Sequence, residues 1–255
     1  MSDQRQYHIA LSAADIQGGA DVLLPGDPGR VADLARSLDE NAVALGANRE
    51  YCSWLAHLDG RPVLVCSSGL GAPSTAVAVE ELANIGLKRF IRVGTTGAIQ
   101  PDIDFADIVI SKAAVRLEGT SSHYAPMAYP AVASFSLTQR LVAAAERLGV
   151  PHHVGITASS DTFWPGQERY DSHSGYVRRA FQGSLAEWRA LGVANFEMEA
   201  AALFTTCSTF GLEAACLCGV IARRVDSQAV DHDAYPLAAE RWQAIIREAL
   251  VGTRG

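Results

Sequence analysis

Short apolar runs alternate with amphipathic stretches along most of this 255-residue chain. An apolar run bounded by turn residues predicts a buried strand, and apolar positions three and four residues apart predict a helix with one buried face. The predicted strands are residues 21–25, 51–58, 62–67, 89–94, 107–115, 153–159 and 213–221. The predicted helices are residues 30–38, 73–87, 137–148, 185–191, 199–210 and 237–250.

This alternation predicts an α/β fold in a single domain, residues 1–255, with a mixed central β-sheet flanked by helices. The sheet is expected to be mixed because Asp59 and Gly60 predict a tight hairpin turn, which joins antiparallel strands. The sequence has no linker, repeat or low-complexity tract that would divide the domain. Two long loops, residues 117–133 and 161–183, are expected to carry function, because long loops in compact domains usually do.

Composition and charge exclude several classes of protein. Hydrophobic residues make up 49% of the chain and charged residues 19%, which is close to the average of globular proteins. The net charge is -7, so the broad basic surface that nucleic acid requires is not expected. The first residues are polar, and the apolar stretch 200–222 is broken by Gly211 and Glu213. We therefore expect a soluble, cytoplasmic protein that binds neither nucleic acid nor a membrane.

The five cysteines are odd in number and lie in apolar surroundings, so they are expected to be reduced, buried thiols. The histidines show no spacing typical of a metal site. His8 alone would be taken for a solvated residue near the terminus. No motif for a serine or cysteine nucleophile is present.

The first candidate site is the turn at residues 26–30, which follows a predicted strand. Gly26 would let backbone N–H groups approach an anion, and Arg30 would add a pair of donors from the first turn of the helix. Asp27 and Pro28 are also typical of an ordinary helix start, so a capped turn with a solvated arginine is the alternative.

The second candidate is Arg92, which lies inside an apolar strand. A buried charge without a partner is costly, so Arg92 must face either a carboxylate of the protein or a bound anion. Thr95 and Thr96 are expected to follow in a loop at the carboxyl end of that strand, where α/β sheets place their ligands.

The third candidate lies in the long loop, where Phe163 is followed by Gln167 and Arg169. The ring can stack on a planar heterocycle, while the amide and the guanidinium can hydrogen-bond to its edge. This set suits a base with a carbonyl–NH–carbonyl edge, such as uracil. A surface turn with a packed aromatic residue is the alternative.

The fourth candidate is the pair Glu197 and Glu199, predicted to open an apolar helix. These carboxylates could accept hydrogen bonds from a vicinal diol, or they could simply complement the helix dipole. The glycine loop at residues 69–74 is a weak dinucleotide motif, because it lacks the third glycine and the later acidic residue.

Taken in order, residues 25–30, 49–50, 92–97, 159–170 and 197–199 resemble the purine and uridine nucleoside phosphorylase family. The resemblance runs from about residue 8 to residue 224, nearly the whole chain. The segment with Gln167 and Arg169 is the most specific, because it is typical of the uridine branch. The other motifs are shared more widely within the family.

The resemblance implies a role for each of these residues. The implied phosphate site consists of Gly26, Arg30, Arg92 and Thr95, with Arg49 supplied by a neighbouring subunit. The implied ribose site consists of Thr95, Met198 and Glu199, with His8 reaching across a dimer interface. The implied uracil site consists of Thr96, Phe163, Gln167 and Arg169. Arg92, Gln167, Arg169 and Arg224 are the residues implied in catalysis, and Glu50 and Ser74 match positions that hold potassium between subunits. The family assembles as hexamers, trimers of dimers, so a homohexamer is expected.

The implied activity is the reversible phosphorolysis of uridine to uracil and ribose 1-phosphate. Inorganic phosphate would be the co-substrate, and no cofactor would be required. The purine branch places an Asp just after the last strand, whereas this chain has Arg223 and Arg224 there and Asp226 only later. A purine nucleoside phosphorylase, or a non-catalytic nucleoside-binding protein on the same fold, remains the alternative.

Four positions depart from the family pattern. Arg223 and Val225 flank Arg224 where a smaller polar residue and a hydroxyl residue are usual. Trp164 replaces a smaller aromatic residue, and Asn48 precedes Arg49 where His is expected. The stretch 227–232 differs as well. These departures concern the loop near the base and the breadth of the base pocket.

Overall fold

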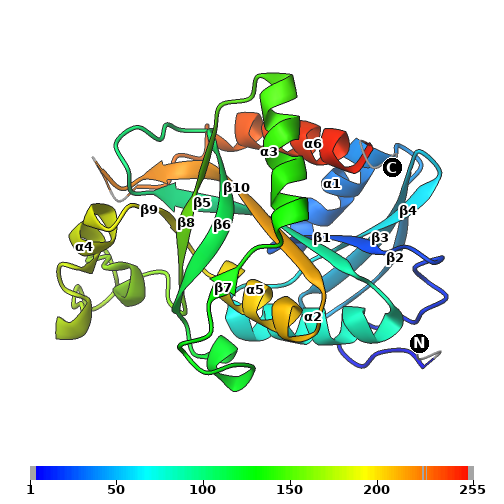
Figure 1. The fold of residues 1–255 in the computed structure, drawn as a ribbon, viewed down its shortest axis with the longest axis horizontal. Coiled ribbons are helices and arrows are strands. Elements are labelled where there is room, and N and C mark those ends of the chain that lie inside the picture. Colours follow the sequence, from blue (N-terminus) through cyan, green and yellow to red (C-terminus); the bar gives the residue numbers. More distant parts are fainter. Residues whose placement is uncertain (1–3, 226, 228, 252–255) are drawn as a thin grey trace.

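The computed structural model describes residues 4–225, 227 and 229–251. Figure 1 shows the arrangement of its helices and strands. The strands are β1 (Asp21–Pro25), β2 (Val43–Asn48), β3 (Tyr51–Leu58), β4 (Arg61–Cys66), β5 (Arg89–Ala98), β6 (Ile108–Leu117), β7 (Ala131–Val132), β8 (His152–Ser160), β9 (Val193–Glu197) and β10 (Glu213–Arg223). The α-helices are α1 (Val31–Leu38), α2 (Ala72–Ile85), α3 (Phe135–Leu148), α4 (Ser184–Ala190), α5 (Ala200–Thr209) and α6 (Tyr235–Val251). Short 3-10 helices are η1 (Pro28–Arg30), η2 (Thr120–His123), η3 (Pro165–Gln167) and η4 (Arg179–Phe181).

The strands form one mixed sheet, as the sequence predicts. Its order is β10-β6-β8-β9-β5-β1-β4-β3-β2, and β10 also pairs with β5. This extra pairing closes the first five strands of that order into a ring. β1 runs parallel to both β4 and β5, and β5 runs parallel to β10, whereas β3 runs antiparallel to β4. The predicted hairpin is also present, because Asp59 and Gly60 both have positive φ.

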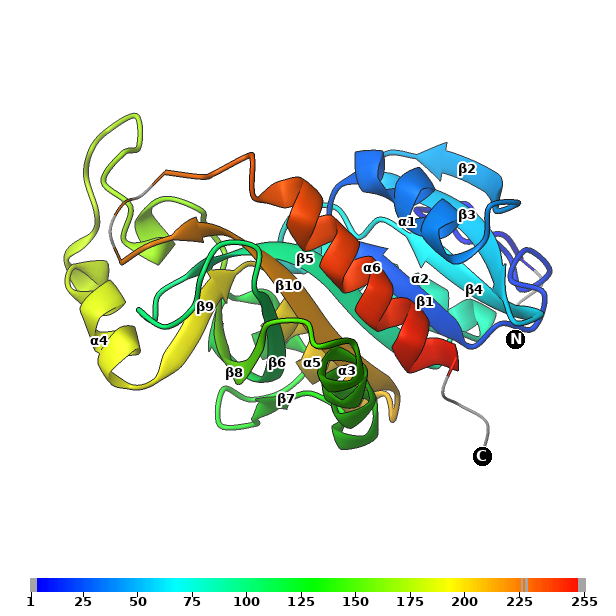
Figure 2. The same cartoon turned by 90° about the horizontal axis from the view of Figure 1, so that it is seen from above.

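Helices cover both faces of this sheet, which confirms the predicted α/β class. The apolar faces of α1, α3 and α6 form one core with the sheet, through residues such as Leu34, Leu141 and Trp242. The helices α2 and α5 form the other core, through residues such as Leu82 and Phe204. Figure 1 shows the first group above the sheet and the second below it. In Figure 2, β2 and β3 lie at one end of the molecule and α4 with its loops at the other.

Three strands, β2, β7 and β9, were not predicted. β7 has only two residues, too few to form a pattern. β2 is exposed along most of its length, so it has no alternating apolar signal. β9 is buried along its whole length, yet it carries Asn195 and Glu197 among apolar residues. The strand ends at Glu197, and α5 begins at Ala200 with Glu199 as its N-cap. The predicted position of the two carboxylates at the start of this helix is therefore confirmed.

The predicted loop containing Thr95 and Thr96 is also wrong, because both residues belong to β5. Strand β10 extends the pairing, with Gly219 opposite Thr95 and Val220 opposite Thr96. Gly97 then pairs with Phe196 on β9. Closure of the sheet thus keeps β5 regular beyond the point where its apolar run ends.

All five cysteines are free, as predicted, and four are buried, whereas Cys52 is only half-buried. Burial raises the pKa of the Cys66 thiol to about 12, so this thiol stays protonated at neutral pH. Within residues 4–225, 227 and 229–251, we find no helix with both the length and the apolar character that crossing a bilayer requires.

Replacing Gly219 by alanine is expected to lower the free energy of unfolding by about 1–3 kcal/mol, as overpacking of a buried site does. The added Cβ would lie 2.6 Å from the Cβ of Ala238 and 2.9 Å from the Trp242 ring. Urea unfolding measures the effect. Gly119→Ala is the matched control, because the Cβ added at residue 119 would lie 3.7 Å from its nearest neighbour, Asp161 Oδ2. Equal stability of Gly219→Ala and the parent chain would contradict this packing of β10 against α6.

Candidate active site

A cavity of about 450 Å³ opens where β1, β5, β9 and β10 end, a volume in the range of small-molecule sites. It brings together most of the residues that the sequence singled out. The predicted residues in its lining are Gly26, Arg30, Glu50, Arg92, Thr95, Thr96, Phe163, Gln167, Arg169, Met198 and Glu199. The predicted residues outside its lining are His8, Arg49, Ser74 and Arg224.

One end of the cavity is suited to an anion. Asp27 caps η1 by accepting a hydrogen bond from the N–H of Gly29 at 2.8 Å, and this turn presents Gly26 and Arg30 to the cavity. Arg92 enters from β5. A Cβ added to Gly26 would lie 3.3 Å from Gly69 O and 3.8 Å from Arg92 Nη1, so the turn and the guanidinium lie close together. Arg92 Nη1 is buried and has no hydrogen-bond partner among the described residues.

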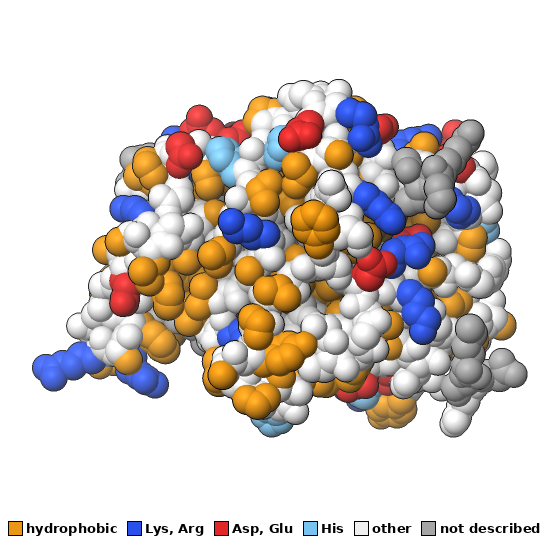
Figure 3. Space-filling view, viewed as in Figure 1, with side chains coloured by type: hydrophobic (Ala, Val, Ile, Leu, Met, Phe, Trp, Pro, Cys, Tyr) orange, Lys and Arg blue, Asp and Glu red, His pale blue; other side chains and the backbone are white. Residues whose placement is uncertain are grey.

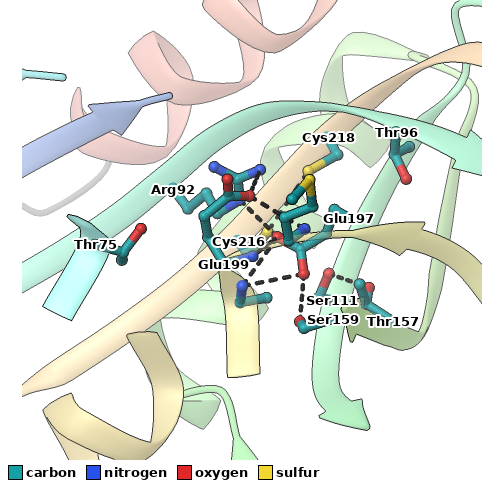
Figure 4. Close-up of polar contacts among 12 residues, drawn as sticks. Thr75, Arg92, Thr96, Ser111, Thr157, Ser159, Glu197, Glu199, Cys216 and Cys218 are labelled. Atoms are coloured by element: carbon teal, nitrogen blue, oxygen red, sulfur yellow. Dashed lines mark hydrogen bonds and ion pairs between the residues drawn. The ribbon is translucent and has the colours of Figure 1, made fainter. Parts of the chain in front are cut away.

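The rest of the Arg92 guanidinium is held by two buried carboxylates. Arg92 Nε donates to Glu197 Oε2 at 2.8 Å, and Arg92 Nη2 lies 2.5 Å from Glu199 Oε2. Figure 4 shows the three side chains converging. Burial alone would lower the pKa of Arg92, but the two carboxylates raise it well above its ordinary value. The internal ion pair that the sequence left open is therefore present, and one guanidinium nitrogen remains directed toward Gly26.

Glu197 and Glu199 have different surroundings. Glu197 accepts from the backbone N–H of Ala200 at 2.9 Å and from the hydroxyl of Ser159, so it fixes the start of α5. Glu199 lines the cavity and accepts from the N–H of Gly71 at 2.7 Å. Burial raises the pKa of Glu199 to about 7. The negative charge of Glu197 raises this pKa further, whereas the positive charge of Arg92 lowers it.

The glycine loop after β4 is part of the site, although the sequence predicted only a weak nucleotide motif there. Gly69 has φ +71, and an added Cβ would lie 2.8 Å from Glu50 Cγ and still closer to Ser74 Oγ. Ser74 Oγ donates to Glu50 Oε1 at 3.1 Å, so the two residues matched to a potassium site are in contact. Within the described ranges, no cluster of three or more His, Cys, Asp or Glu side chains could hold a metal ion.

The opposite end of the cavity is suited to a planar base. Gln167 and Arg169 are buried, and the Arg169 guanidinium lies 4.3 Å from the centre of the Phe163 ring. Arg169 N–H donates to Trp164 O at 2.8 Å, which closes the turn around η3. Glu168 accepts from the N–H of Leu185 at 2.6 Å and also from the N–H of Gly183, so α4 anchors this turn.

Arg224 lies beside the base end rather than in the lining. Its guanidinium is 5.5 Å from the centre of the Phe196 ring, and its Nη2 donates to Glu168 O at 3.3 Å. Burial and the positive charge of Arg169 lower the pKa of Arg224 to about 10, so it still carries its charge at neutral pH. The neighbouring Arg223 turns away and contacts Asp104 at 2.9 Å, so this departure from the family pattern leaves the cavity unchanged.

A chain of buried polar groups fixes Thr96. Its hydroxyl donates to Phe196 O at 2.6 Å and accepts from Asn195 Nδ2 at 2.7 Å. Asn195 Oδ1 accepts from Thr157 at 2.8 Å, and Thr157 contacts Ser111 at 2.6 Å. Figure 4 shows Thr96, Ser111 and Thr157 at this edge of the site. These polar residues on β9 and β8 explain why an apolar pattern did not reveal β9.

His8 and Arg49 lie together outside the cavity. His8 Nδ1 is 2.7 Å from Glu81 Oε1, and Asn48 Nδ2 donates to His8 O at 2.8 Å. The Arg49 guanidinium lies 5.7 Å from the centre of the Tyr7 ring. The unusual Asn48 therefore holds the segment that carries His8.

Several residues of the lining had no signal in the sequence. They are Leu70, Phe196, Ile221, Ala222 and Val230. Most are apolar and resemble core residues, so only the way the strand ends meet reveals them. Glu197 was singled out for a diol, whereas it holds Arg92. Asp226, which the sequence places in the loop after β10, lies outside the described residues.

A sequence profile of the phosphorylase superfamily matches residues 21–251. Over 228 residues the chain is 51% identical to a uridine phosphorylase of Escherichia coli (strain K12), a match that covers 89% of this chain and 90% of that protein. It is 49% identical over 223 residues to a uridine phosphorylase of Thermococcus kodakarensis, covering 88% and 79% of the two chains. A guanosine phosphorylase of Halorubrum lacusprofundi is 36% identical over 216 residues, covering 85% and 83%. The chain belongs to the phosphorylase superfamily.

Proposed function

We propose that this protein is a uridine phosphorylase, a pentosyltransferase that converts uridine and phosphate to uracil and ribose 1-phosphate, reversibly. The observation that carries the proposal is a single cavity with an unpartnered Arg92 Nη1 at one end and Gln167 with Arg169 at the other. Relatives named uridine phosphorylase, about half identical to this chain over most of its length, support it.

At the anion end, Gly26, Arg30, Arg92 and Thr95 hold phosphate. Arg92 is fixed by its two carboxylates, so it is oriented before the anion arrives. Next to it, Glu199 accepts hydrogen bonds from the 2′- and 3′-hydroxyls of ribose, and Met198 packs against the sugar. With the phosphate residues and the base residues lining one cavity, phosphate would lie on one side of C1′ and the base on the other.

At the base end, Phe163 stacks on uracil while Gln167, Arg169 and Thr96 hydrogen-bond to its edge. Arg224 acts from behind the turn by adding positive charge near Arg169. Carbonyl oxygens of uracil gain negative charge as the base leaves, so donors placed there stabilise the transition state more than the bound substrate.

The reaction needs no nucleophile from the protein. A phosphate oxygen bonds to C1′ while the N1–C1′ bond breaks, through an oxocarbenium-like transition state. The bonding electron pair passes to uracil. The proton released by phosphate is taken up at uracil N1, which gives neutral uracil and ribose 1-phosphate.

A purine nucleoside phosphorylase is the alternative, supported by the 36% identical relative named guanosine phosphorylase. Purine chemistry needs a group that protonates the ring. Among the described residues, the carboxylates that line the cavity are Asp27, Glu50, Glu197 and Glu199, all toward the phosphate and ribose end. This distribution favours a pyrimidine. A nucleoside-binding protein without turnover is a further alternative, which the assay below separates.

We also infer that the protein assembles as a hexamer, a trimer of dimers, in which His8 and Arg49 complete the cavity of a neighbouring subunit. Their absence from the lining of their own cavity supports this. Exposed apolar side chains, including Met127, Val132 and Phe135, also call for a partner surface. Figure 3 shows hydrophobic side chains gathered over the lower part of one face, where β7 and α5 lie. A monomer mass in solution at assay concentration would contradict the assembly.

We also propose that potassium binds at the dimer interface, between Glu50 and Ser74. It rests on their contact at 3.1 Å and on the glycine that lets them approach. Equal stability and activity in sodium and in potassium buffers would contradict it.

No other cofactor, nucleic acid or membrane is expected. A cytoplasmic location and a single domain spanning residues 1–255 stay predictions.

The experiment that tests the function is the release of uracil from uridine, followed by absorbance with and without inorganic phosphate. We expect release only with phosphate, and little or no turnover of inosine. Release that does not depend on phosphate would mean hydrolysis. Turnover of inosine alone would establish the purine alternative, and saturable uridine binding without turnover would establish the binding protein.

The double variant Gln167→Ala/Arg169→Ala is expected to lower kcat/KM for uridine by at least about a hundredfold, because two hydrogen bonds to a developing charge are lost. The KM for phosphate should change by less than about twofold, because the anion end is untouched. Arg179→Ala, an exposed arginine in the same loop, is the matched control and should match the parent chain. Equal losses toward both substrates would mean that the turn only supports the fold.

A further inference from the structure

Arg30 lies against an aromatic ring and has only a distant, exposed carboxylate as its ion-pair partner. Its guanidinium carbon lies 4.7 Å from the centre of the Tyr235 ring. Arg30 lines the main cavity and also a neighbouring small cavity of about 80 Å³, which Tyr235 and Trp242 share. The ring therefore lies on the side of Arg30 that faces away from the substrate.

The contrast with Arg92 shows why this matters. Arg92 is fixed by carboxylates at 2.8 and 2.5 Å, which use its donors and offset its charge. The carboxylate nearest to Arg30 among the described residues is Asp27, whose Oδ2 is 3.6 Å away and whose side chain is 57% exposed. An aromatic face attracts a guanidinium without taking its N–H donors. Arg30 also contacts the Tyr235 hydroxyl. It thus stays oriented while most of its N–H donors remain available to an anion.

Tyr235 is itself well fixed. Its ring meets the buried Trp242 edge to face, with centres 5.6 Å apart, and Trp242 packs against Gly219 of β10. Burial raises the pKa of the Tyr235 phenol, so the ring is neutral at working pH. Tyr235 is the first residue of α6 and closely follows Val230, which lines the cavity.

We propose that Tyr235 is a positioning residue for phosphate, which acts by fixing the Arg30 guanidinium through its ring face. The inference rests on the proposed function and extends it to a residue that does not touch substrate.

The test is a comparison of Tyr235→Leu, Tyr235→Phe and the parent chain by steady-state kinetics with uridine and phosphate. Tyr235→Leu removes the ring, and we expect the KM for phosphate to rise about three- to tenfold, the range of a partly buried cation–π contact. The KM for uridine should change by less than about twofold. Tyr235→Phe keeps the ring and should restore most of the phosphate affinity. A phosphate KM for Tyr235→Leu equal to the parent value would overturn the proposal.

Trp54→Leu is the matched control, because Arg36 lies over the Trp54 ring at the same 4.7 Å but outside the cavity. It should lower the melting temperature without changing the phosphate KM. A rise of the phosphate KM in Trp54→Leu equal to that in Tyr235→Leu would mean that general loosening near α1 is responsible, and would overturn the proposal.

A double-variant cycle with Arg30→Ala separates positioning from a general structural role. If Tyr235 acts through Arg30, Tyr235→Leu should add little to the phosphate KM once Arg30 is alanine. Full additivity would overturn the proposal. The proposed function is tested separately, by the assay of the parent chain. It would be contradicted if the parent chain released uracil without phosphate, whatever the variants do.

Discussion

The structure of the site depends on one buried ionic cluster, Arg92 with Glu197 and Glu199. Charges withdrawn from water are tolerated only when they are paired and hydrogen-bonded, and here β5, β9 and the start of α5 each contribute one partner. Glu197 also binds the first N–H groups of α5, and Glu199 binds the glycine loop after β4. Removing one member would therefore leave another charge buried without a partner and disturb several elements at once.

The same cluster explains the division of labour among the arginines. Its carboxylates offset the positive charge of its one guanidinium, so Arg92 alone attracts an anion weakly. Arg92 instead contributes a well-oriented donor, because its Nη1, which has no hydrogen-bond partner among the described residues, is directed toward Gly26. In the proposed function, Arg30 adds positive charge at this end, because it lies against a neutral ring and its carboxylate partner Asp27 is 3.6 Å away and exposed. At the base end, Arg169 and Arg224 place two positive charges near each other, with burial tending to lower the pKa of both.

Much of this could be predicted from the sequence, for reasons that particular residues make clear. Apolar runs such as β1 and the amphipathic α3 show their period directly. Arg92 was conspicuous because a charge inside an apolar strand demands a partner. The loop with Gln167 and Arg169 was conspicuous because of its aromatic and bidentate groups. Strand β9 gave no such signal, because Asn195 and Glu197 interrupt its apolar run. These two polar side chains are buried only because they find hydrogen-bond partners across the closed sheet. Phe196, Ile221 and Tyr235 are ordinary apolar or aromatic residues in sequence, and only the meeting of β9, β10 and α6 with β5 places them near a ligand.

The central claim is that a single cavity holds phosphate at Arg92 and Arg30 while the base lies against Phe163, Gln167 and Arg169. A crystal structure with phosphate and a non-reactive uridine analogue tests it most directly. The account predicts a phosphate oxygen within about 3 Å of Arg92 Nη1, a second contact to Arg30, and the uracil ring stacked on Phe163. A phosphate bound away from Arg92, or a base lying against Glu199 instead of Arg169, would contradict it.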